Sequence, residues 1–440
     1  MLAVALAPEA NAQRRRHKRS SHRRGHSAKV YQQRASKRSL AYQTKTRRYA
    51  KLVNMESTGE LFQQPHVEGR GLYVPPSFGL PAYSAKGLQP GGATNDPLAF
   101  NYGLRRGTNL SHWLSQSAKR GQQREQYLQE TDIEWLRSVG LDHVRLPVDE
   151  EQLWHQDGTQ NDTAFLLMHK AIGWCMARNM KVIVDLHIIR SHYFNAASNT
   201  LWTSEQDQNH LLILWRELSE ALKGYPNSMV AYEMMNEPVA PDPAQWNALV
   251  TKLHRVIRAL EPDRWLVIGS NMWQSTETFD QLQIPEGDPH IVLSFHFYEP
   301  FFLTHYKAAW VPQRSWTGRV RYPGYTFAIE DATGQDSTVV QMMKKHHKLW
   351  DARALDQMLA KPLALSRKMN LPLYCGEWGC YQKTPMPDRL RWYQDMRRVF
   401  ELHHIPWATW DYKGSFGLKL QDGTPCQEIL VVLLDAPIKR

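Results

Sequence analysis

Two glutamates at the ends of short apolar runs have side chains that could act as acid, base or nucleophile. The stretch VAYEMMNEPVAP, Val230 to Pro241, begins as a buried-looking strand and ends on Asn236-Glu237-Pro238. A second run, LPLYCGEWG, carries Glu377 near its end. A carboxyl group in such a place is suited to donating a proton, accepting one or attacking a substrate.

Other polar and aromatic side chains close four further apolar runs. They are Arg145, Asp185 with His187, His296 with Tyr298, and Trp410. One polar residue at a strand end is usually a satisfied core group. Six runs that all end in this way indicate a shared site, because buried charge is costly unless it is paired.

Two carboxyl groups facing each other across one cleft predict glycoside hydrolysis with retention. That reaction needs a protonated acid near the leaving oxygen and an ionised carboxylate about 5 Å away. We expect Arg145 and Tyr298 to hold Glu377 ionised, and we expect burial and the nearby anion to keep Glu237 protonated. The indole of Trp410 offers a flat apolar face to a sugar ring.

Eight short runs of mostly β-branched or aromatic residues would form the strands that position these groups. They are GLRRGTNL, HVRLPV, KVIVDLH, MVAYEMMNE, WLVIGS, IVLSFHFY, LPLYCGEWG and IPWATWDY. Amphipathic segments separate them. Leucines at 211, 214, 218 and 222 have helical spacing before Gly224, and a second helical pattern runs from Trp246 to Leu260.

Strands that alternate with helices predict parallel βαβ units, and eight units predict closure into a (β/α)₈ TIM barrel. An open doubly wound sheet is the alternative. It would normally carry a glycine-rich phosphate loop after the first strand, and RGTNLSHW is not such a loop. We therefore expect a barrel over residues 104–440, preceded by an irregular lead-in at 56–103.

The order of these motifs resembles glycoside hydrolase family 5, a cellulase-like family, over roughly residues 104–415. In that family the acid/base closes strand four and the nucleophile closes strand seven. The resemblance implies that Glu237 is the acid/base, that Glu377 is the nucleophile and that Asn236 binds the substrate 2-hydroxyl. It also implies substrate-binding roles for seven further residues: Arg145, His187, His296, Tyr298, Trp410 and, in the stretch RGTNLSHWL around the first strand, Asn109 and Trp113.

Structural explanations compete with several of these roles. Glu237 alone could satisfy a helix N-terminus. His187 and His296 could bind a metal, but no H-E-x-x-H motif or carboxylate cluster accompanies them, so we predict neither metal nor cofactor. The remaining candidate sugar platforms are tryptophans, about half of which we expect to be core residues: Trp202, Trp273, Trp310 and Trp316. The last two lie in the long segment 299–350, where we expect specificity to be determined.

The net charge of +11 comes from a tail. Between Arg14 and Lys51 there are 15 basic and no acidic residues, which leaves 39 basic against 43 acidic groups elsewhere. This excludes a domain-wide nucleic-acid footprint. We expect residues 1–55 to be disordered and to be an export or linker remnant, with contact to an anionic cell surface or to nucleic acid as alternatives.

The first 13 residues contain a short apolar run and an A-x-A site, which we interpret as a truncated signal peptide of a secreted or periplasmic protein. No apolar run reaches the roughly 18 residues of a membrane span. The four cysteines, Cys175, Cys375, Cys380 and Cys426, lack zinc-site spacing, and buried free thiols are expected.

The sequence thus predicts a monomeric, retaining hydrolase of a β-linked polysaccharide, with β-1,4-glucan as the favoured substrate. Mannanase, β-1,3-glucanase, xyloglucanase and transglycosylase activities remain open, because the shared residues act only at the sugar being cleaved. From other classes, a non-hydrolytic carbohydrate-binding barrel and a nucleic-acid-binding protein acting through its tail remain alternatives.

Overall fold

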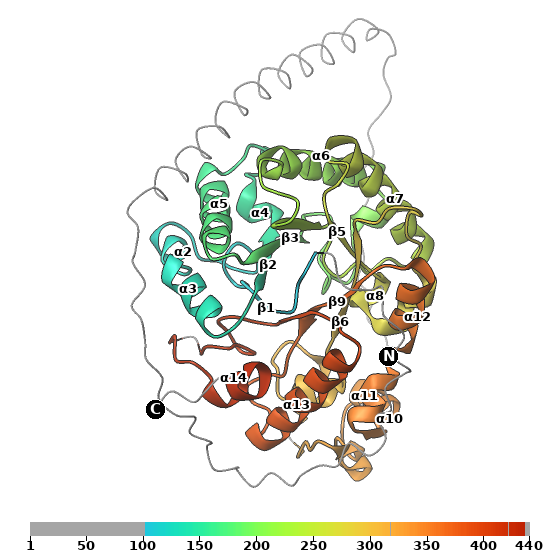
Figure 1. Ribbon diagram of the computed structural model, residues 1–440. Helices are drawn as coiled ribbons and strands as arrows, with labels where there is room; N and C mark the ends of the chain where they lie inside the picture. The colour runs from blue at the N-terminus through green and yellow to red at the C-terminus, as the bar shows by residue number, and fades with distance from the viewer. Residues whose placement is uncertain (1–101, 317, 421, 436–440) are drawn as a thin grey trace, which may run out of the picture. The chain divides into compact units, whose positions relative to one another are not determined.

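The computed structural model describes residues 102–316, 318–420 and 422–435. The predicted tail, 1–55, and nearly all of the lead-in lie outside this part of the chain. Eight parallel strands close into a barrel, with the last strand hydrogen-bonded to the first (Figure 1). This closure confirms the predicted (β/α)₈ architecture and excludes the open sheet.

Each of the eight apolar runs corresponds to one barrel strand, and β2 and β3 extend one residue past their runs. The strands are β1 (Arg106–Asn109), β2 (His143–Asp149), β3 (Lys181–Ile188), β4 (Val230–Glu233), β5 (Leu266–Gly269), β6 (Ile291–Phe297), β9 (Leu373–Trp378) and β10 (Trp407–Thr409).

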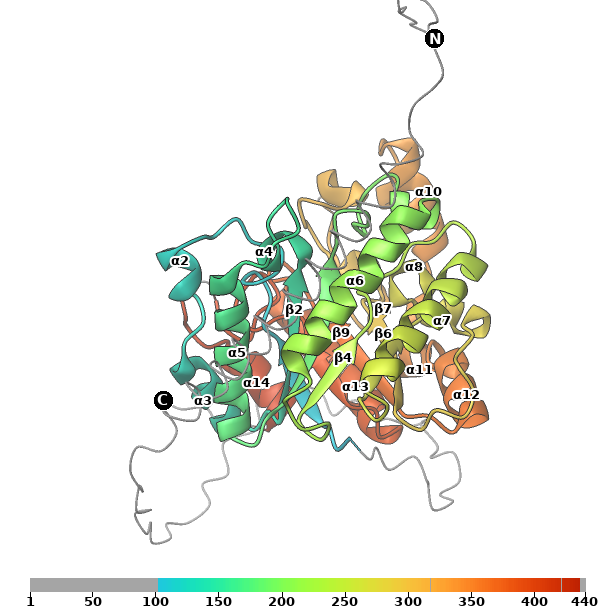
Figure 2. The same cartoon turned by 90° about the horizontal axis from the view of Figure 1, so that it is seen from above.

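Helices surround the barrel and connect successive strands (Figure 2). They are α2 (Gln122–Glu125), α3 (Glu130–Ser138), α4 (Glu150–Leu153), α5 (Asp162–Ala177), α6 (Glu205–Leu222), α7 (Pro243–Leu260), α8 (Asn271–Gln274), α12 (Ala360–Met369), α13 (Met386–Leu402) and α14 (Gln427–Leu434), with 3₁₀ turns η1 (Thr200–Trp202) and η2 (Thr276–Gln281). The predicted leucine stripe is the buried face of α6. Asp242 caps α7 and Pro243 occupies its first turn, which explains where that helix begins.

The segment 299–350, called the insertion below, follows β6 and has its own small elements. They are α9 (Phe301–Thr304), η3 (Pro312–Ser315), β7 (Gly324–Tyr325), η4 (Ile329–Ala332), α10 (Ser337–His346) and β8 (Leu349–Trp350), after which α11 (Ala352–Gln357) leads back to the barrel. β7 and β8 form an antiparallel pair separate from the barrel.

The interior of the barrel changes from apolar to charged along the strands. Ile183, Ala231 and Val292 belong to one buried cluster within the barrel. Because alternate residues of a strand face the same side, Asp185 and Glu233 lie two positions further along the same inner face. The carboxyl ends of the strands therefore carry the polar groups.

A bulge interrupts this alternation in β9. Phe295 of β6 lies opposite Cys375, and the next residue, His296, lies opposite Glu377. Gly376 is thus an extra residue, as expected of a β-bulge, which commonly re-aims a side chain next to an active site. A side chain at this position would crowd β6, because a Cβ on Gly376 would lie 3.0 Å from the Ser294 Oγ.

Candidate active site

Glu237 and Glu377 approach each other at the carboxyl end of the barrel. Glu237 follows β4, and Glu377 lies near the end of β9. With His296 between them, one side-chain oxygen or nitrogen from each of the three residues lies within 4.8 Å of the other two. Both glutamates are buried but retain a small exposed fraction, 8% for Glu237 and 5% for Glu377. This proximity is the one required of a pair that acts on a single bond.

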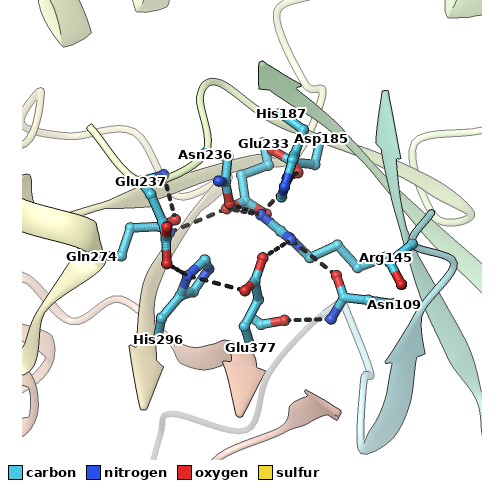
Figure 3. Close-up of polar contacts among 12 residues, drawn as sticks. Asn109, Arg145, Asp185, His187, Glu233, Asn236, Glu237, Gln274, His296 and Glu377 are labelled. Atoms are coloured by element: carbon cyan, nitrogen blue, oxygen red, sulfur yellow. Dashed lines mark hydrogen bonds and ion pairs between the residues drawn. The ribbon is translucent and has the colours of Figure 1, made fainter. Parts of the chain in front are cut away.

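Arg145 of β2 is fully buried at the centre of the site and contacts carboxylates from three strands (Figure 3). The partners of its guanidinium are Glu233 (Nε to Oε2, 2.6 Å), Asp185 (Nη2 to Oδ2, 2.9 Å), Glu377 (Nη1 to Oε1, 2.7 Å), Asn109 (Nη1 to Oδ1, 2.9 Å) and Asn236 (Nη2 to Oδ1, 2.8 Å). A planar fork of donors suits such a cluster, and the pairing makes the burial of these charges tolerable.

The two glutamates have different pKa values because their surroundings differ. Glu377 accepts hydrogen bonds from Arg145 and, at 3.0 Å, from the hydroxyl of Tyr298. Burial raises the pKa of Glu377, and the Arg145 charge opposes that rise. Burial and the charge of Glu377 raise the pKa of Glu237 well above its usual value. Glu237 is therefore the member of the pair that keeps a proton.

Two histidines complete the site in neutral form. The Nδ1 of His296 lies 2.8 Å from Glu237 Oε1, and burial lowers the pKa of His296 well below its usual value. His187 is held by Asp185 at 2.7 Å, and burial lowers its pKa to about 3. The ring of His187 stacks on Trp410, with centroids 5.6 Å apart and planes 7° apart.

The other residues predicted for substrate binding occupy different surroundings. Asn109 lies behind Arg145 and donates to the carbonyl of Gly376 at 2.9 Å, so it supports the site from beneath. Trp113 is fully buried and donates its indole N–H to the Arg124 carbonyl at 2.7 Å. No face of the Trp113 ring is open to a ligand, because the tryptophan packs in the core.

The four further tryptophans divide as the sequence predicts. Trp202 and Trp316 are buried, whereas Trp273 and Trp310 are 47% and 54% exposed. Trp310 packs edge-to-face on Tyr381, which belongs to the same apolar cluster as Trp410. The insertion therefore brings one exposed aromatic face near the catalytic end.

Sequence reasoning missed Glu233 and Gln274, both fully buried in the site. Glu233 was detectable, because it follows the inward-facing Ala231 by two residues. Gln274 lies in an irregular turn after β5, where no periodic pattern points to it.

Glu237, His296 and Glu377 are also the one group of three in the described part of the chain whose geometry would suit a metal ion. Their atoms are engaged with each other and with Arg145 and Tyr298. The three side chains are thus held together by protein contacts. The absence of a metal from the reaction stays a prediction.

Comparison with known proteins identifies a matching family and relatives along most of the chain. Residues 106–415 match the model of the cellulase family, glycosyl hydrolase family 5. Endoglucanase C of Acetivibrio thermocellus is 30% identical over 336 residues, which are 74% of this chain and 97% of the relative. Cellodextrinase A of Ruminococcus flavefaciens is 26% identical over 308 residues, covering 69% of this chain and 84% of the relative.

Solved structures agree on the fold. An endoglucanase from the hyperthermophilic Thermotoga maritima superposes with a TM-score of 0.63 at 24% identity, covering 77% of this chain and 99% of that structure.

Proposed function

Because the chain belongs to glycosyl hydrolase family 5, we propose that this glycosyl hydrolase cleaves β-1,4-linked glucan with retention of configuration. The observation that carries the proposal is the pair Glu237 and Glu377, whose side chains lie together with His296 within 4.8 Å. Such close carboxyl groups favour a double displacement over direct attack by water, which needs a wider gap. The endoglucanase and cellodextrinase relatives favour glucan.

In the first step, a carboxylate oxygen of Glu377 attacks the anomeric carbon and the bond to the leaving oxygen breaks. Glu237 gives its proton to that oxygen, so the departing chain leaves as an alcohol. In the second step, Glu237 removes a proton from water, which attacks the anomeric carbon and releases Glu377 as a carboxylate.

The surrounding residues orient these groups. Arg145 and Tyr298 direct the two oxygens of Glu377. The Nδ2 of Asn236 is buried and has no hydrogen-bond partner in the described part of the chain, so it is available to bind a substrate hydroxyl. His296 and His187 add neutral hydrogen-bonding groups, and Trp410 contributes apolar surface for the ring.

A polymeric glucan substrate, which would lie outside the cell, favours an extracellular location for the enzyme. No helix among the described residues combines the length and apolar character of a membrane span. We propose a secreted or periplasmic monomer whose basic tail is an export or linker remnant. Fractionation of the producing cells and light scattering of the purified protein test these two points.

The decisive experiment is a panel of soluble polysaccharides with reducing-end analysis and NMR of the first anomer released. We expect cleavage of β-1,4-glucan with initial release of the β-anomer. Faster cleavage of mannan, β-1,3-glucan or xyloglucan would reassign the substrate. Binding of glucan without any cleavage would replace the hydrolase by a carbohydrate-binding barrel.

A further inference from the structure

We propose that Gln274 is a positioning residue for the general acid, holding Glu237 in its reactive orientation and linking it to the buried support of the nucleophile. The inference rests on the proposed roles of Glu237 and Glu377 and extends them to a side chain that does not touch substrate. Figure 3 shows Gln274 beside Glu237.

The carboxamide of Gln274 makes two different hydrogen bonds. Its Oε1 accepts the backbone N–H of Glu237 at 3.1 Å, and its Nε2 donates to Glu233 Oε1 at 3.1 Å. The first bond needs an acceptor and the second needs a donor. A carboxamide supplies both, whereas an apolar side chain supplies neither and a carboxylate supplies only the acceptor.

The backbone of Glu237 needs this support. Glu237 has a φ of 42°, in the left-handed region that non-glycine residues rarely adopt. Without Gln274 its N–H would be buried and unpaired, which is unfavourable. Such a residue persists only where its surroundings hold it.

Residues 271–274, which form the irregular turn labelled α8, make further hydrogen bonds to the loop that follows β4. The N–H of Trp273 donates to the Pro238 carbonyl at 3.3 Å. Asn271 brackets Ala240, accepting its N–H at 2.8 Å and donating to its carbonyl at 2.9 Å. The whole loop that follows β4 is therefore fixed by the turn that follows β5.

The turn itself is built to place Gln274. Met272, Trp273 and Gln274 have successive φ values of 54°, 61° and 52°. This path folds the Gln274 side chain against the end of β5, where only glycine fits. A Cβ on Gly269 would lie 2.2 Å from the Gln274 Nε2. The three left-handed residues and Gly269 together place the carboxamide of Gln274.

Gln274 also connects the two catalytic glutamates. It bonds Glu233, Glu233 pairs with Arg145 at 2.6 Å, and Arg145 contacts Glu377 at 2.7 Å. The acid and the nucleophile are thus held by one continuous set of hydrogen bonds through Glu233. Loss of Gln274 should affect the acid first, because of the two catalytic glutamates only Glu237 is bonded to it directly.

The test compares leaving groups in Gln274→Leu. We expect kcat/KM for soluble β-1,4-glucan to fall about 100-fold, the order of loss for a misplaced catalytic group. For a dinitrophenyl β-cellobioside, whose leaving group needs no proton, we expect a fall of less than about threefold. kcat/KM is used because it reports on the bond-breaking step. An equal loss on both substrates, or no loss, would overturn the proposal.

Gly269→Ala provides an independent variant, because it keeps the carboxamide but displaces it. We expect the same preference for the activated substrate, and unchanged selectivity would count against the proposal. Gln281→Leu, an exposed glutamine in the same connection, is the matched control and should resemble wild type. A wild type that cleaves neither substrate would instead overturn the proposed function, and the role of Gln274 with it.

Discussion

The catalytic end of the barrel and the insertion are stabilised in different ways. Arg145 forms hydrogen bonds or ion pairs with five residues, so its position is determined by polar contacts. Both regions leave some buried polar atoms without a partner among the described residues, such as Asn236 Nδ2 in the site and Trp316 Nε1 in the insertion. In the insertion, aromatic contacts such as Phe302 with Phe327, at 4.6 Å between centroids, hold the chain.

This difference matches two requirements of the enzyme, accurate placement of the catalytic groups and an adaptable surface for substrate choice. Proton transfer and nucleophilic attack tolerate little misplacement, and directional hydrogen bonds supply that accuracy. Apolar packing is less directional, so a region held by it accepts changes in shape more readily. We therefore expect substitutions in the barrel to alter the rate of the reaction, and substitutions in the insertion to alter the choice of substrate.

The largest effect should follow Glu377→Ala. Without a nucleophile, hydrolysis of glucan should fall by about 10⁴-fold or more, as expected for loss of a covalent catalyst. Calorimetry with a β-1,4-glucan oligosaccharide should still detect binding, because the remaining site is intact. Glu286→Ala, an exposed glutamate, is the control. Residual activity within about tenfold of wild type would exclude Glu377 as the nucleophile.

The next effect concerns pH. Activity requires Glu377 ionised and Glu237 protonated, so kcat/KM should rise as the first loses its proton and fall as the second does. Burial raises both pKa values, that of Glu237 further, which moves this window above the usual glutamate value of about 4.3.

Glu237→Gln should remove the alkaline limb of this profile and lower activity on glucan by about 10²–10⁴-fold. The acid limb should remain, and a dinitrophenyl cellobioside makes it measurable. An alkaline limb that survives the substitution would assign the acid to another group.

The smallest effect is expected in the insertion. Trp310→Ala removes an exposed aromatic face worth about 0.5–1.5 kcal/mol, so KM for the preferred glucan should rise about fivefold. kcat should stay within about twofold, because the catalytic glutamates are untouched. Leu349→Ala, also exposed in the insertion, is the control. A fall in kcat equal to that of a barrel variant would contradict the separation of the two regions.

The barrel could be predicted from sequence because its repeating pattern is local. Each apolar run became one strand, and the residues at the run ends converged because the parallel strands all end on the same side. Arg145, Glu237 and Glu377 lie together for this reason. Their proposed catalytic roles remain predictions that the substitutions above test.

The features that could not be predicted from the sequence depend on contacts between irregular segments. Gln274 reaches Glu237 because three successive residues have left-handed backbone conformations, which no sequence periodicity predicts. Trp113 was expected near the sugar, yet its indole donates to the carbonyl of Arg124 in the same connection, between β1 and β2. The internal order of the insertion likewise follows from aromatic packing between residues far apart in sequence.

The extra glycine in β9 lets both Tyr374 and Glu377 face the inside of the barrel, which regular alternation of side chains would not allow. Tyr374 belongs to the barrel's inner apolar cluster, so strict alternation would turn Glu377 outward, toward the helices. Gly376 restores its inward direction without disturbing the residues before it. Deleting Gly376 would therefore leave Glu377 facing inward, directly after Cys375 in regular alternation, whereas pairing Gly376 as an ordinary strand residue would turn the Glu377 carboxylate outward, toward the helices.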